Sequence, residues 1–426
     1  MNEDFLHFLW KNGLYKTPLS NCYTNELVEV ILPGQHNFDQ GPDFFNARIK
    51  IGSTIWAGNV EIHQRSSDWK RHKHHLDKAY GNIILHVVGK NDEKIIGSNG
   101  ELIPVVELDC LPELYNRYMF LMQTQKWLPC QSFIADVNPF VMEMWYESLA
   151  IERISDKIDT IVSSLKFTKN NWEESFYYIV AQAFGLKANA QPFFMLAQSL
   201  PLNVLAHHKN SLVQVEALLF GQAGLLPSQP SDDYTTLLNR EYLHLKQKYS
   251  LQPIETHLWK FARMRPASLP TIRIAQFAML IHKTSGLLSK IVDCKSIGDI
   301  KKFFDLGVSE YWLTHYIFGK ETINKRKNIG QLALSTIIIN AFVPFIFHYG
   351  KSVGKSQLAD TAIEWLEQLP GEVNQILAQW QTFGVEAKSA LESQALIQLT
   401  NCYCQKRRCL YCRVGRQVLS PIFKTN

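Results

Sequence analysis

The sequence predicts an α+β protein with an N-terminal α/β part, a large mostly helical domain and a short cysteine-rich tail. Runs rich in Ile, Val, Trp and Phe at residues 44–51, 54–63 and 82–88 are typical of strands. From residue 113 apolar residues recur at helical spacing instead, and four cysteines gather near the end of the chain. These changes of pattern predict three segments, residues 1–112, 113–400 and 401–426.

Composition describes an ordered soluble protein, with 46% hydrophobic and 19% charged residues in a chain of 426. The net charge of +5 permits a polyanionic partner. The N-terminus lacks the order of a signal peptide, and the longest apolar run, residues 335–347, is too short to span a bilayer. Eight cysteines in a chain of this length do not indicate a secreted disulfide scaffold. We therefore expect a cytoplasmic protein without a membrane partner.

The N-terminal elements follow from local pattern. Residues 3–15 predict an amphipathic helix and residues 26–32 an alternating first strand. Gly52 and Ser53 separate the next two strands and predict a tight hairpin. Residues 68–80 predict a helix with an N-cap at its start, and residues 102–108 a further strand.

A candidate metal site lies on this framework. Asp43 opens one strand, and Glu61 and His63 stand two apart near the end of the next. Because side chains alternate along a strand, Glu61 and His63 share one face of the sheet. If Asp43 points to that face, two carboxylates and an imidazole converge, a set that suits a hard divalent cation such as Mg²⁺ or Mn²⁺.

This pattern resembles the PD-(D/E)XK nuclease superfamily, through Pro42-Asp43 and then Glu61-Ile62-His63. There, an aspartate at a strand start and an acid-x-lysine on the next strand hold magnesium and activate water. The resemblance implies a restriction-endonuclease-like core, with Asp43 and Glu61 holding the metal and His63 orienting or deprotonating water. Histidine stands where the family has lysine. Some branches add an acid from a preceding helix, a role open to Glu3, although the helix dipole also favours an acid there.

The segment 68–80 is crowded with histidines. His72 and His75, at i and i+3, are the pair expected to face each other on a helix. A metal site and a solvated polar face are both open interpretations of this segment.

Two further stretches carry candidate sites. Arg263, Arg265 and Arg273 gather around two prolines and suit a phosphate clamp, or else a structural loop in which they cap helix carbonyls and pair with acids. The tail predicts a Zn²⁺ or iron–sulfur site, with zinc favoured because four local thiols suffice. Its cysteines are Cys402, Cys404, Cys409 and Cys412.

A second resemblance covers nearly the whole chain. The runs GPDFFNARI, GNVEIH, DWKRHKHHLDKAY and RMRPASLPTIRIAQFA and the terminal cysteines are similar to a bacterial family known as domain of unknown function 2851. That resemblance implies no activity. We therefore expect a metal-dependent nuclease-like phosphodiesterase acting on DNA or RNA, with a catalytically degenerate nucleic-acid-binding or scaffold protein as the alternative. A third interpretation is an enzyme acting on a small phosphorylated substrate through the three arginines.

Overall fold

The computed structural model describes residues 1–98 and 100–420 as an α+β chain in two compact units. Unit 1 comprises Met1–Trp145 with Leu399–Asn426, and unit 2 comprises Tyr146–Gln398. This division differs from the three predicted segments, because residues 113–145 and the tail belong to unit 1. Arg117 Nη1, for example, donates to the carbonyl of Val418 at 3.3 Å. Residues 421–426 of the predicted tail lie outside the described residues.

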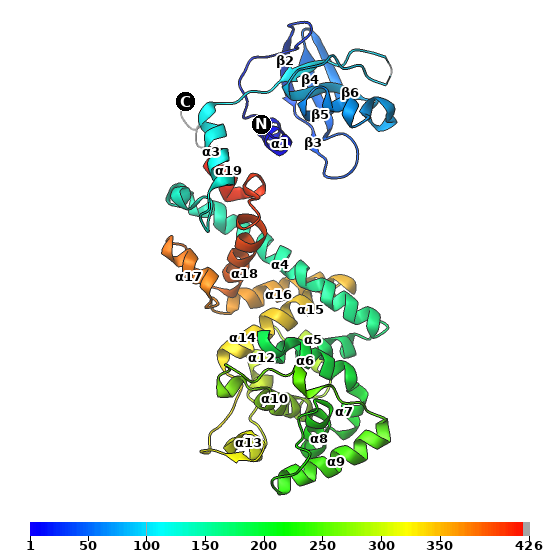
Figure 1. Ribbon diagram of the computed structural model, residues 1–426, viewed down its shortest axis with the longest axis vertical. Coiled ribbons are helices and arrows are strands. Elements are labelled where there is room, and N and C mark those ends of the chain that lie inside the picture. Colours follow the sequence, from blue (N-terminus) through cyan, green and yellow to red (C-terminus); the bar gives the residue numbers. More distant parts are fainter. Residues whose placement is uncertain (99, 421–426) are drawn as a thin grey trace. The chain divides into compact units, whose positions relative to one another are not determined.

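Unit 1 is built on a mixed seven-stranded sheet (Figure 1). The order is β1-β2-β4-β5-β6-β7, with β3 paired to β4. Strands β2, β4 and β5 are antiparallel neighbours, whereas β5, β6 and β7 run parallel. The strands are β1 Leu19–Ser20, β2 Leu27–Leu32, β3 Gln35–His36, β4 Phe44–Ile51, β5 Thr54–Arg65, β6 Ile83–Lys90 and β7 Val105–Glu107. The predicted strands are thereby confirmed, with small shifts at their ends.

The hairpin between β4 and β5 sets the register of the site. Ile51 pairs with Thr54, and Gly52 in the turn has a φ of 58°, which glycine adopts without strain. At the other end of β4 the pairing shifts between Phe44 and Ala47. Asn46 there has a φ of 57°. Such a bulge re-aims the chain locally, and here it lies directly after Asp43.

Helices complete unit 1. Helix α1 (Glu3–Asn12) is capped by the Asn2 side chain and packs against β5. Helix α3 (Pro112–Gln123) contacts α19 from the C-terminal tail (Figure 1). The remaining elements are η3 Gln131–Asp136, the first residues of α4 Pro139–Phe167, η7 Leu399–Cys404, η8 Cys409–Tyr411 and α19 Arg413–Leu419.

The helix predicted over residues 68–80 is wrong beyond its first turn. The structure has α2 (Asp68–Arg71) followed by two short 3₁₀ turns, η1 (His74–Leu76) and η2 (Lys78–Tyr80). Lys73 has a φ of 64° and a ψ of 25°, a left-handed conformation that cannot continue a right-handed helix. The chain therefore changes direction between His72 and His74.

Unit 2 is helical, as predicted, apart from one short hairpin. Its buried apolar residues form a continuous core from Ala150 to Leu391. The sequence showed no hairpin signal, but β8 (His315–Ile317) pairs with β9 (Lys320–Glu321) around Gly319, which has a φ of 67°. The helical elements after α4 are α5 Trp172–Phe184, α6 Leu186–Ser199, α7 Leu202–His208, α8 Leu212–Gln222, α9 Asp233–Tyr249, η4 Thr256–Leu258, η5 Pro266–Ser268, α10 Pro270–Lys283, α11 Leu287–Val292, α12 Ile297–Phe304, α13 Tyr311–Thr314, α14 Gln331–Ile337, η6 Ile338–Phe342, α15 Val343–Ser352, α16 Ser356–Gln368, α17 Gln375–Thr382 and α18 Ala390–Gln398.

One helical stretch of unit 2, Gln331–Ser352, is long and apolar enough to cross a membrane by length and composition alone. Of its most apolar window, 61% is buried inside the structure. A core helix passes the same test of length and composition, so this stretch does not by itself indicate a membrane span.

Candidate metal centre

Asp43 and Glu61 are held together by reciprocal hydrogen bonds between neighbouring strands. The backbone N–H of Asp43 donates to Glu61 Oε2 at 3.1 Å, and the backbone N–H of Ile62 donates to Asp43 Oδ2 at 2.8 Å. Glu61 is 4% exposed and Asp43 is half-buried. The structure thus brings together the two carboxylates that the sequence singled out, each oriented by the other's strand.

Helix α1 adds two more groups to this site. Glu3, His7 and Asp43 each offer one ligand atom, and these three atoms all lie within 4.8 Å of one another. The sequence pointed to Glu3 as a possible additional acid of the site, but not to His7. Its signal was its spacing, since His7 lies four residues after Glu3 and therefore on the same helix face.

The three carboxyls crowd one another electrostatically. Burial raises the pKa of Glu3, and the charge of Asp43 raises it further. Burial also raises the pKa of Glu61 far above its ordinary value, with Asp43 as the second cause. Like charges in a buried space destabilise each other, and a divalent cation with oxygen ligands would relieve that repulsion. The donor set therefore fits Mg²⁺ or Mn²⁺.

His7 directs a ring nitrogen at the carboxyl of Asp43. Its Nε2 lies 3.2 Å from Asp43 Oδ2, but the alignment is not that of a hydrogen bond, and this buried atom has no hydrogen-bond partner. Burial lowers the pKa of His7, but the contact with Asp43 and the charges of Glu3 and Asp4 outweigh burial, so the pKa is raised overall. The raised pKa makes His7 a stronger proton acceptor than an ordinary histidine.

His63 is deeply buried and neutral. Burial, followed by the neighbouring histidines, lowers the pKa of His63 to about 2. Its Nδ1 lies 2.8 Å from His86 Nε2, and its Nε2 lies 3.1 Å from His72 Nδ1. Both nitrogens therefore have imidazole partners, an arrangement that leaves His63 poorly placed to deprotonate water.

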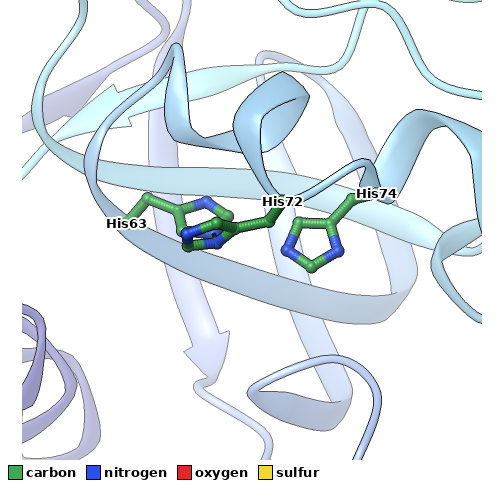
Figure 2. Close-up of side chains that lie close together, drawn as sticks. All are labelled: His63, His72 and His74. Carbon is green, nitrogen blue, oxygen red and sulfur yellow. Dashed lines mark hydrogen bonds between the residues drawn. The ribbon is translucent and has the colours of Figure 1, made fainter.

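The histidines after α2 turn back toward His63. His63, His72 and His74 each offer a ring nitrogen, and the three nitrogens lie within 4.8 Å of one another (Figure 2). His74 Nε2 also lies 3.3 Å from Glu61 Oε1. The facing pair predicted on a helix, His72 with His75, is wrong because the chain is not helical there.

A groove beside this site carries more basic than acidic side chains. It lies between α1 and the start of α19, and its lining includes Lys11, Arg413 and Arg416 together with His7 and the acidic Asp4. Within the described residues, neither Lys11 nor Arg416 has an acidic partner at salt-bridge distance. These charges remain available to a ligand, so the groove suits an anionic chain that passes His7.

The three arginines of unit 2 do not share one environment. Arg263 and Arg265 are exposed, but Arg273 is 5% exposed and lies in α10 rather than in a loop. Arg273 Nη1 donates to Gln276 Oε1 at 3.1 Å, and burial lowers the pKa of Arg273 to about 10. Pro270 begins this helix, a position that proline favours, so the predicted loop ends before Arg273.

The tail cysteines gather with a cysteine that is remote in sequence. Cys130, Cys404, Cys409 and Cys412 are each 6–7% exposed, whereas Cys402 is half-buried. Burial raises the pKa of the Cys404 thiol, and the charges of the other three raise it further. No three of these sulfur atoms lie within 4.8 Å of one another in the described chain.

Burial outweighs the neighbouring arginine at the tail thiols. It raises the pKa of Cys409 to about 11, whereas the charge of Arg407 acts to lower it. Arg407 also donates to the carbonyl of Thr124 at 2.7 Å, and this bond ties the tail to the segment that carries Cys130.

Comparisons with known proteins identify a family. Comparison with curated proteins and with solved structures gives no match. One family model, described as "Protein of unknown function (DUF2851)", matches residues 3–375, a range that includes the candidate metal centre and most of unit 2. The expected membership is confirmed over this range, which ends before the terminal cysteines, and the chain belongs to this family.

Proposed function

We propose that the protein is a metal-dependent phosphodiesterase that hydrolyses nucleic acid at the Asp43–Glu61 site. The observation that carries this proposal is the pair of reciprocal hydrogen bonds that joins Glu61 to Asp43, which itself lies with Glu3 and His7. Support also comes from the strand order. Two antiparallel strands carry the acids, and a short helix then leads into a parallel strand, as the PD-(D/E)XK resemblance implies.

Glu3, Asp43 and Glu61 would hold the cation. A divalent cation bound there polarises phosphoryl oxygens and lowers the pKa of bound water. The chain's own groups then position the substrate, with Lys11, Arg413 and Arg416 contacting the phosphate backbone along the groove.

Hydrolysis forms a bond from phosphorus to the water oxygen and breaks the phosphorus–ester oxygen bond. His7, whose Nε2 lies 3.2 Å from Asp43 Oδ2, would accept the proton of the water and pass it to solvent, and a solvent water would protonate the leaving oxygen. The products are a phosphate monoester and a free hydroxyl. His7 thus takes the proton-transfer role that the sequence had suggested for His63.

The test is cleavage of labelled single- and double-stranded DNA and RNA with Mg²⁺ or Mn²⁺. Asp43→Asn and Glu61→Gln should each lower the rate at least about 100-fold, the scale of losing a group that stabilises the transition state. Asp39→Asn, an exposed aspartate in the loop before Asp43, should leave the rate unchanged.

Cleavage that survives both active-site substitutions would place the chemistry elsewhere. Salt-dependent binding of nucleic acid without metal-dependent cleavage by the wild type would instead support the alternative of a degenerate nuclease-like binding or scaffold protein. The specific observation that favours this alternative is the histidine in place of lysine at position 63.

A further inference from the structure

We propose that His63, His72 and His74 form a second metal site, selective for a transition metal such as Zn²⁺, Co²⁺ or Ni²⁺ over Mg²⁺. The rings come from two elements, His63 from β5 and the other two from the segment after α2 (Figure 2). Three imidazoles suit borderline metals, whereas Mg²⁺ prefers oxygen ligands.

The geometry of the donors supports one shared ion. His63 Nε2 and His72 Nδ1 are 3.1 Å apart, and Glu61 Oε1 lies 3.6 Å from His63 Nε2 and 3.3 Å from His74 Nε2. The three nitrogens therefore lie around one point, and Glu61 Oε1 lies beside two of them. Three histidine nitrogens with a fourth position left for another ligand form a known type of zinc site.

The groups behind the donors orient them as metal ligands. His63 Nδ1 lies 2.8 Å from His86 Nε2. If Nδ1 carries the ring proton and donates it to His86, the lone pair of His63 Nε2 is directed at the metal site. The ring of Tyr80 packs on His74 with a centroid distance of 3.9 Å. Such outer contacts fix the tautomer and the ring plane of metal-binding histidines.

The backbone is shaped to bring the ligands together. Lys73, between His72 and His74, holds a left-handed conformation that is unfavourable for a residue with a Cβ atom. Without this reversal, residues two apart on a helix would point to different sides. Strain of this kind often marks functional sites.

The second metal has a consequence that rests on the proposed function. Among the described residues, the only basic side chains within salt-bridge distance of the Asp43 and Glu61 carboxylates are histidines. A divalent ion on the histidines would supply the positive charge that lysine supplies in the resembling nucleases. Glu61 lies between both sites, and paired metals flanking a phosphodiester are an established means of stabilising its hydrolysis.

The test uses the full-length, chelator-treated protein titrated with Co²⁺, with the visible spectrum and calorimetry as readouts. His72→Ala and His74→Ala should weaken cobalt binding at least about tenfold, because loss of an outer-shell partner alone costs 10–100-fold. His75→Ala is the matched control on the same segment and should bind as the wild type does. Excess Mg²⁺ should not displace the cobalt.

The tail thiols can also bind cobalt and contribute to the visible spectrum. The spectrum of His74→Ala is therefore subtracted from that of the wild type, because the thiol contribution is the same in both proteins and cancels. His72 is exposed, and its substitution should leave the fold intact. Equal cobalt binding by the wild type and both histidine variants would overturn this inference. Histidine-dependent binding in a protein that cleaves no nucleic acid would retain it and reject the proposed function. Asp43→Asn should abolish cleavage but keep the cobalt spectrum.

Discussion

At the scale of single residues, Glu61 has an unusual position because it touches both groups of candidate ligands. Its Oε2 accepts a hydrogen bond from the N–H of Asp43, and its Oε1 lies near His63 and His74. The neutral histidines offer it no positive charge, so the metal-free protein favours the protonated carboxyl. Its ionisation is thus linked both to metal binding and to folding.

This linkage predicts a pH dependence of stability. The pKa of Glu61 in the folded protein is raised above the ordinary value of 4.5, so the folded state binds the proton more tightly than the unfolded state. The contribution of Glu61 to the unfolding free energy of the metal-free protein should therefore fall as pH rises above about 5, by up to about 1.4 kcal/mol per pH unit. His63, whose pKa is lowered, contributes with the opposite sign below the ordinary histidine pKa of 6.5, so the contribution of Glu61 is the difference between the wild type and Glu61→Gln. Denaturant unfolding from pH 5 to 8 measures this slope.

Glu61→Gln serves as the control, since it removes the titrating group while keeping the shape of the side chain. The wild type should lose more stability than Glu61→Gln as pH rises from 5 to 8. Added Mn²⁺ should restore the stability of the wild type more at pH 8 than at pH 5. Identical slopes in the two proteins would contradict the raised pKa.

At the scale of elements, the sequence was informative where one local pattern decides the structure. The β-branched and aromatic runs predicted β4 and β5. The two-residue spacing of Glu61 and His63 predicted that both side chains lie on the same face of the sheet. The helix prediction for the segment after Asp68 was wrong, because its composition is typical of a helix and does not reveal the left-handed backbone of Lys73. Cys130 is brought to the tail cysteines by tertiary packing, and no local spacing links it to them. His7 did have a local signal, its position four residues after Glu3, but only the fold shows that this helix face meets Asp43.

The tail yields a prediction about metal content. Cys130, rather than Cys402, lies with Cys404, Cys409 and Cys412 among the buried thiols. Around one zinc ion at about 2.3 Å the sulfurs would stand roughly 4 Å apart, whereas no three of them lie within 4.8 Å of one another in the described residues. In a four-iron cluster each cysteine binds a separate iron and the sulfurs stand farther apart, so we predict such a cluster rather than zinc.

Elemental analysis and the visible spectrum of protein purified without oxygen test this assignment. Cys130→Ser should lose the iron and the brown colour, whereas the matched substitution Cys402→Ser should keep both. Zinc in place of iron would change the identity of the ion but keep Cys130 as a ligand. Equal metal loss in both variants, or thiols that all titrate freely, would contradict the assignment.

At the scale of the whole molecule, the two units should differ in their dependence on the C-terminus. Removing residues 399–426 takes Val414, Val418 and Leu419 out of unit 1. At about 1.5–3 kcal/mol for each buried side chain, the loss is comparable with the whole stability of a typical domain, about 5–15 kcal/mol. The core of unit 2 lies between Ala150 and Leu391 and keeps all its residues.

Calorimetry and limited proteolysis of the truncated chain measure this difference. We expect the transition of unit 1 to be lost while that of unit 2 remains, with a resistant fragment near residues 146–398. The isolated fragment 146–398 should show the same remaining transition. Loss of both transitions on truncation would mean that the units do not fold independently.

The discontinuity of unit 1 also has a consequence for biosynthesis. A ribosome makes the sheet and the Cys130 segment first, then the whole of unit 2, and only then the residues that complete unit 1. At about 5–20 residues per second this delay lasts on the order of ten seconds to a minute. During that time the surfaces that later contact α19 stay uncovered on the nascent chain, so they are candidate contact sites for chaperones in the cell.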